Sequence, residues 1–252
     1  PYSRNIPELL GDFGEFYRQC VMECNRFYIE TMKRIGYRGV VVCNARPTFA
    51  GGRAQWETLP AVDQHAYYVH PSNWVAPGSF VGQASYITGR AGTLRYLAGC
   101  RLLGRPFLVG EYNHCFWNPY QYEQPLCMAA YAAFQNFNAL SIHENPVLLT
   151  LPDRGFSGEA TPFFVGNSPV LRAGEFLGAM FFRRQDVTSA RHWTALRVSG
   201  NFYRQRDNAD ATMSGMQTQI ALLTGFGTIH EDVACFPGTV SAPEADLSVM
   251  PS

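Results

Sequence analysis

The sequence has no excess of charge of either sign and no long hydrophobic run. Its 252 residues include 20 Lys and Arg and 20 Asp and Glu, so the formal net charge is zero. Without a basic field to attract a phosphate backbone, nucleic acid is not expected as a partner. No run approaches the ~18 apolar residues of a membrane span, so no membrane span is expected either.

Several motifs of cofactor chemistry are also missing. The chain contains no GxGxxG, no Walker loop and no HExxH, which leaves dinucleotide, NTP and zincin chemistry without support. None of its seven cysteines forms a CxxC pair, and the spacing of Cys20 and Cys24 fits one helix face better than a zinc site. We therefore expect no metal and no other cofactor. His114 and Cys115 are adjacent, so their side chains point apart, which disfavours a Cys–His nucleophile pair.

The composition is that of a globular protein, with 46% hydrophobic and 14% aromatic residues. Apolar residues at helical spacing predict helices over residues 13–35, 92–103 and 123–137. Apolar and β-branched runs predict strands over residues 39–45, 63–71, 107–113 and 139–145. This alternation of helices and strands predicts an α/β fold with a parallel sheet.

All four predicted strands end in polar or aromatic residues. In parallel sheets, functional residues lie beyond the carboxyl ends of the strands. The residues there are the site candidates: Asn44, Arg46, His65, Tyr67, Glu111, Asn113, Trp117, His143 and Glu144. Because His65 and Tyr67 are two positions apart on a strand, their side chains are expected on the same face.

Four segments, in their order along the chain, resemble the second half of a clan A glycoside hydrolase. DQHAYYVHP is similar to the sixth strand of that family, and GRPFLVGEYN to the seventh, in which the nucleophilic Glu follows an apolar run. YAAFQNFNALSIHENP resembles the seventh helix and eighth strand. SPVLRAGEFLGAMFFRRQDV resembles the closing helix, with Gln185 where bacterial members have Gly. The resemblance covers about residues 13 to 190.

This resemblance implies a (β/α)8 TIM barrel, of which residues 1–190 supply strands five to eight. Residues 191–252 would form a C-terminal extension, a small and mainly β appendage. Strands one to four, and with them the acid/base Glu, would lie before Pro1, in a separate chain or segment. A secreted or periplasmic location follows only from the habit of the family.

The resemblance also implies a retaining glycoside hydrolase acting on a β-linked oligo- or polysaccharide, with Glu111 as nucleophile. Tyr67 would hydrogen-bond Glu111, and the other candidates would contact the carbohydrate substrate. Three alternatives stay open. Glu111 forms a salt bridge with a loop arginine, the chain is a non-catalytic carbohydrate-binding or scaffold barrel without its acid, or Glu111 is the general base of an unrelated reaction.

Overall fold

The structure, a computed structural model, describes residues 7–43, 48–73, 76–115, 118–143, 163, 165, 168–198, 217–230 and 239–242. The chain forms two compact units. The first unit comprises Pro1–Gln64, Ala98–Leu108 and Arg191–Ser252, and the second comprises His65–Leu97 and Val109–Ala190. The predicted division into domains 1–190 and 191–252 stays a prediction.

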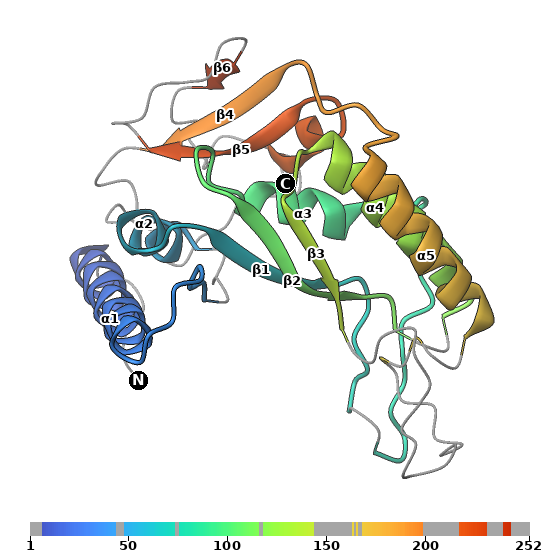
Figure 1. Ribbon diagram of the computed structural model, residues 1–252, viewed down its shortest axis with the longest axis horizontal. Coiled ribbons are helices and arrows are strands. Elements are labelled where there is room, and N and C mark those ends of the chain that lie inside the picture. The colour runs from blue at the N-terminus through green and yellow to red at the C-terminus, as the bar shows by residue number, and fades with distance from the viewer. Residues whose placement is uncertain are drawn as a thin grey trace. The chain divides into compact units, whose positions relative to one another are not determined.

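The first sheet is parallel and has three strands, in the order β1 (Val62–Tyr67), β2 (Phe107–Asn113), β3 (Ala139–Ile142) (Figure 1). At the start of β1 the amide of Val62 donates to the carbonyl of Pro106 at 2.9 Å, and beyond its end the amide of Tyr68 donates to that of Asn113 at 3.2 Å. The difference in residue number between the two bonded residues is nearly the same at both ends of β1, as parallel pairing with β2 requires. The carboxyl ends of the strands therefore meet at one edge.

The connections between these strands contain helices. α3 (Gly92–Cys100) lies between β1 and β2, and η1 (Gln121–Glu123) and α4 (Gln124–Phe134) lie between β2 and β3. These helices and strands confirm the predicted alternation over this part of the chain. One polar turn, formed by Gln135 and Asn136, follows α4. Asn136 adopts a positive φ of 53° in this turn.

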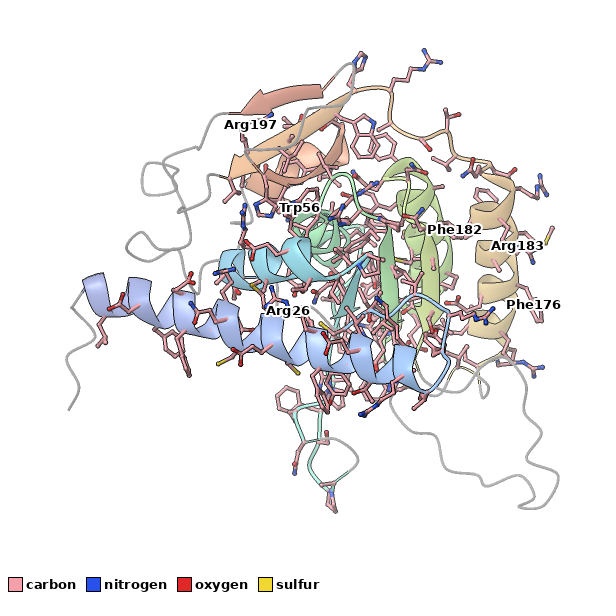
Figure 2. The ribbon with its side chains drawn as sticks, turned by 60° about the vertical axis from the view of Figure 1, so that its left-hand side comes forward. Arg26, Trp56, Phe176, Phe182, Arg183 and Arg197 are labelled. Atoms are coloured by element: carbon pink, nitrogen blue, oxygen red, sulfur yellow. The ribbon has the colours of Figure 1, made fainter. Side chains whose placement is uncertain are left out.

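α5 (Pro169–Arg184) packs closely along α4 (Figure 1). Two glycines one turn apart permit the approach. A Cβ atom on Gly174 would lie 2.8 Å from Cγ of Pro125, and one on Gly178 would lie 2.8 Å from the carbonyl oxygen of Pro125. Phe176 of the same helix is 61% exposed (Figure 2).

Both ends of α5 are capped. The hydroxyl of Ser168 accepts a hydrogen bond from the amide of Leu171 at 3.2 Å. At the other end Gln185 adopts a left-handed conformation with φ of 54°. The amides of Gln185 and Asp186 donate to the carbonyls of Phe182 and Phe181, each at 3.2 Å, which is the Schellman arrangement.

The first unit begins with two helices, α1 (Pro7–Arg34) and α2 (Phe49–Thr58). α2 was not predicted; it starts at Thr48, whose hydroxyl accepts from the amide of Gly51 at 3.1 Å. No helix in the described ranges is both long and apolar enough to cross a membrane.

A second parallel sheet lies in the first unit, with β4 (Trp193–Val198) between β5 (Gly225–His230) and β6 (Thr239–Ala242). A short helix, η3 (Gln217–Leu222), precedes β5. Leu103, Ala195 and Ile229 form a buried cluster against which Trp193 packs.

The prediction of a TIM barrel, or of half of one, is wrong. The described strands form two separate sheets of three strands, and no barrel is closed. The predicted strand over residues 39–45 is also wrong in its described part, because residues 39–43 belong to no strand. Val40 is 61% exposed there, and its carbonyl accepts from the hydroxyl of Tyr37 at 3.3 Å. A β-branched run makes a strand only where a neighbouring strand offers hydrogen bonds.

Candidate functional site

Four of the predicted site residues come together at the carboxyl edge of the first sheet, within the second unit. Tyr67 ends β1, Glu111 lies near the end of β2, and His143 directly follows β3. The amide of His143 donates to the carbonyl of Tyr112 at 3.0 Å, which holds the end of β3 beside β2. His65, two residues before Tyr67, points to the same carboxylate.

The Glu111 carboxylate is the centre of this group. The hydroxyl of Tyr67 donates a hydrogen bond to Oε2 of Glu111. Nδ1 of His65 lies 3.3 Å from the same oxygen, and Nδ1 of His143 lies 3.9 Å from it. The Glu111 side chain is 34% exposed, so a ligand can reach it. The arrangement is a strand-held carboxylate with one phenol and two imidazoles at a single oxygen.

An aromatic ring that sequence analysis missed packs behind these residues. Phe163 is 2% exposed, and its ring centroid lies 5.2 Å from that of Tyr67. The rings of His70 and His143 each lie 5.4 Å from Phe163 as well. Phe163 belongs to none of the helices or strands, so no periodic pattern marked it. Its contacts with Tyr67 and His143 restrict how these two side chains turn toward Glu111.

Asn113 ends β2 and lies next to the site. Its side chain is buried, with 1% of the residue exposed. Its Nδ2 atom donates to the carbonyls of His143 and Phe163, at 2.9 Å in the second case. Asn113 thus joins the end of β2 to the residues after β3 and to Phe163. These bonds give Asn113 a positioning role, while its predicted contact with a substrate stays a prediction.

The remaining candidates lie outside the described residues: Asn44, Arg46, Trp117 and Glu144. The convergence predicted for the four strand ends is therefore seen at three of them. The roles assigned to all of these residues stay predictions.

A second carboxylate lies behind β2, and it is buried. Glu175 of α5 accepts from the hydroxyl of Tyr112 and from Nε2 of Gln124, both at 3.0 Å. Burial raises the pKa of Glu175 and also that of Tyr112. With both oxygens bonded and 9% of the residue exposed, Glu175 joins β2, α4 and α5. It is a structural carboxylate, whereas Glu111 is the accessible one.

His114 and Cys115 follow β2 and are fully buried. Burial lowers the pKa of His114 to about 4, and its ring lies 4.9 Å from that of Tyr68 and 5.1 Å from that of Tyr86. Burial raises the pKa of the Cys115 thiol to about 12, and this thiol donates to the carbonyl of Val69 at 3.0 Å. A buried, protonated thiol is a poor nucleophile, so these two residues act in packing.

The described residues contain no cluster of three or more His, Cys, Asp or Glu side chains that could hold a metal ion. Neither a protein-family model nor a curated protein sequence matches the chain. The geometry around Glu111 is therefore the basis for assigning a function.

Proposed function

We propose that Glu111 is the nucleophile of a retaining glycoside hydrolase that acts on a β-linked oligo- or polysaccharide. One observation carries the proposal: the three described side chains at the Glu111 carboxylate all contact Oε2. Tyr67, by hydrogen bonding to Oε2, fixes the orientation of the carboxylate. Oε1 is then the oxygen that attacks the anomeric carbon.

This site does not require a barrel. The carboxyl edge of the first sheet supplies the nucleophile from β2, the phenol from β1 and one imidazole after β3. Rigid strands hold a reacting group more precisely than loops do. The accessible face of Glu111 is where the sugar would bind, with His65 and His143 near its hydroxyl groups.

A retaining mechanism also needs an acid/base carboxyl about 5 to 5.5 Å from the nucleophile. Among the described residues, no second carboxylate contacts that of Glu111. As the resemblance to clan A glycoside hydrolases implies, we place the acid/base residue in a segment or a separate chain that binds beside the site. Without it, glycosides with poor leaving groups should react slowly, because general acid catalysis contributes about 10² to 10⁴ in rate.

The test uses a leaving group that needs no acid. A 2,4-dinitrophenyl 2-deoxy-2-fluoro-β-glycoside is incubated with the 252-residue chain. Oε1 of Glu111 bonds to the anomeric carbon as the bond to dinitrophenolate breaks, and dinitrophenolate leaves with the electron pair. We expect one fluoroglycosyl group on the peptide that contains Glu111, as measured by mass spectrometry. Several sugars are tried, since the glycan is not specified.

Two variants control this experiment. Glu111→Gln keeps the shape of the side chain and removes the attacking charge, so labelling should stop while the melting temperature hardly changes. Glu23→Gln makes the same change at an exposed position of α1 and should label normally. Label on another residue, or undiminished labelling of Glu111→Gln, would show that Glu111 is not the nucleophile.

The second candidate is a carbohydrate-binding protein without turnover. It is favoured by the lack of a second carboxylate among the described contacts of Glu111. In this case oligosaccharides would bind to the chain in calorimetric titration, and Glu111→Gln would weaken binding. The activated fluoroglycoside would then leave no covalent label.

A further inference from the structure

The exposed face of α1 is apolar, although surface helices normally turn their apolar side inward. From Leu9 to Phe27, the exposed apolar residues and cysteines recur every three or four positions, which places them on one side of the helix. We call this set the apolar stripe of α1; it consists of Leu9, Phe13, Phe16, Cys20, Cys24, Phe27, Tyr28 and Ile35, which directly follows the helix. Both cysteines are exposed, and the other members range from 55% exposed at Leu9 to 69% at Ile35.

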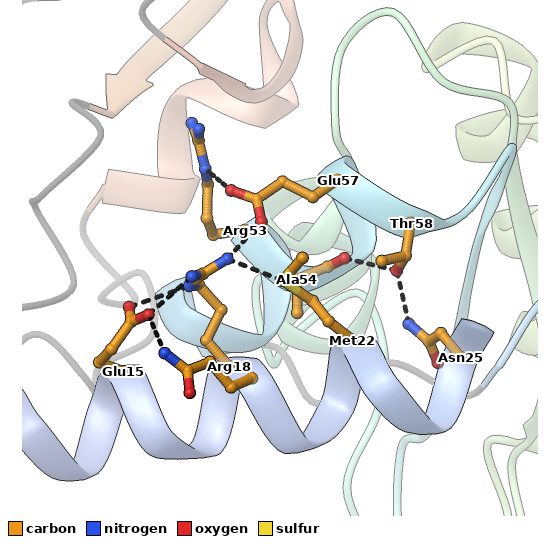
Figure 3. A network of polar contacts seen from close by, with 9 residues as sticks. Glu15, Arg18, Met22, Asn25, Arg53, Ala54, Glu57 and Thr58 are labelled. Atoms are coloured by element: carbon orange, nitrogen blue, oxygen red, sulfur yellow. Dashed lines mark hydrogen bonds and ion pairs between the residues drawn. The ribbon is translucent and has the colours of Figure 1, made fainter. Parts of the chain in front are cut away.

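The opposite face of α1 is already occupied by α2, with polar contacts around the buried Met22 (Figure 3). On this face the guanidinium of Arg18 donates hydrogen bonds to the carboxylates of Glu15 and Glu57. Asn25 is 4% exposed, and its Nδ2 atom donates to the hydroxyl of Thr58 at 2.8 Å. These contacts fix the orientation of α1 on α2, so the helix does not turn its apolar stripe toward α2.

Six of the eight members of the apolar stripe of α1 form pairs placed symmetrically about the level of Met22, whereas Phe13 and Phe27 have no counterpart within the stripe. Cys20 lies two residues before Met22 and Cys24 lies two residues after it. Phe16 and Tyr28 are each six residues from Met22, and Leu9 and Ile35 are each thirteen residues from it. Each pair joins side chains of similar size, small at the centre and large toward the ends. An interface between two copies related by a twofold axis needs this self-complementarity, because each residue meets its counterpart across the axis.

We propose that the apolar stripe of α1 binds the same stripe of a second copy of this chain, with the two helices antiparallel. The charges of α1 favour this orientation over a parallel one. Asp12 is exposed near the start of the helix, while Lys33 and Arg34 are exposed in its last turn. Antiparallel pairing places the acidic end of one copy beside the basic end of the other and opposes the two helix dipoles.

The helix pair leaves the polar flank of α1 in solvent, where Arg26 lies (Figure 2). Burial of the large aromatic members supplies the binding free energy, since buried aromatic side chains dominate such interfaces. The two small cysteines at the centre let the helices approach closely. This interface is independent of Glu111 and of the proposed hydrolase activity.

The first test measures the mass of the full chain by light scattering after gel filtration, with dithiothreitol present. The wild-type chain should be a dimer at micromolar concentrations, and Phe16→Glu should shift it to a monomer. Gln19→Glu adds the same charge to α1 at an exposed position outside the stripe and should stay dimeric. Circular dichroism should show equal helix content in all three. A monomeric wild type, or a dimer that Phe16→Glu leaves intact, overturns the proposal.

The second test determines the orientation by oxidation of chains that keep only one of the two cysteines of the stripe. In an antiparallel dimer Cys20 of one copy faces Cys24 of the other. A mixture of Cys20→Ser and Cys24→Ser chains should therefore give more covalent dimer than either variant alone. Links that form mainly within each variant alone would indicate parallel helices and overturn the antiparallel arrangement.

Discussion

The hydroxyl of Tyr67 donates a hydrogen bond to Oε2 of Glu111, although the two residues are 44 positions apart in the chain. Parallel pairing of β1 and β2 brings them together, because both lie near the carboxyl ends of their strands. The bond joins the accessible carboxylate of the site to the aromatic group around Phe163. A change at Tyr67 should therefore affect the reactivity of Glu111 more than the fold.

Tyr67→Phe removes this hydrogen bond and keeps the ring that packs on Phe163. A hydrogen bond to a charged group contributes about 1.5 to 3 kcal/mol, so labelling of Glu111 by the activated fluoroglycoside should slow about 10- to 100-fold. The rate is followed by release of dinitrophenolate. Tyr122→Phe, at a residue 56% exposed, is the matched control and should label at the wild-type rate. An unchanged rate for Tyr67→Phe would mean that the bond does not assist the reaction.

Asn113→Ala should destabilise the second unit by about 1 to 3 kcal/mol, because it removes the buried donor for the carbonyls of His143 and Phe163. The free energy of unfolding in urea measures this loss. Asn113→Asp should be at least as destabilising, since it places a negative charge against two carbonyls. Stability equal to the wild type in both variants would contradict the positioning role.

Gly178→Ala should destabilise the packing of α4 on α5 by about 1 to 3 kcal/mol, because the new Cβ would lie 2.8 Å from the carbonyl oxygen of Pro125. Thermal unfolding checks this expectation. Gly92→Ala is the control, since a Cβ at Gly92 meets nothing within 4 Å in the described structure. If both variants melt alike, the helices separate more readily than their close approach implies.

His114 should make stability depend on pH. Its pKa falls from 6.5 to about 4 in the folded state, so the unfolded state binds the proton more readily between these values. The stabilising contribution is present above about pH 6.5 and is lost as the pH falls toward 4. His114→Phe keeps an aromatic ring against Tyr68 and Tyr86 and carries no titratable proton. Urea unfolding at pH 7, 5.5 and 4.5 should show a smaller loss for this variant than for the wild type.

The strands of the site were predictable because local sequence carries their signal. FLVGEYN is a continuous apolar run that ends in polar residues, and β2 has the predicted bounds, Phe107–Asn113. The same rule failed at residues 39–43, where none of the described strands pairs with the β-branched run. α2 was missed because its two glycines and few apolar residues give no helical period, and its capping residue Thr48 is the only local signal.

The partners of Glu111 were predictable only in part. The order of strand ends placed Tyr67, His65 and His143 near it, because parallel strands align their carboxyl ends. Sequence could not show that Asn113 turns inward, since that depends on which carbonyls lie behind β2. Whether strands assemble into one sheet or two depends on contacts between residues far apart in the sequence. The resemblance to a barrel family therefore predicted a closed barrel, whereas the described strands form two separate sheets.

Gln185, which stands where the closing segment that the chain resembles has Gly, occupies the left-handed position of the cap after α5. Glycine adopts that conformation without a steric penalty, whereas a residue with a Cβ is strained by roughly 1 kcal/mol. The departure therefore has its effect on the backbone at the end of a helix and not on the chemistry of the site. The capping bonds of Gln185 and Asp186 to α5 are backbone bonds that either residue type can make. A chain with glycine at this position would keep the same turn and gain stability from it.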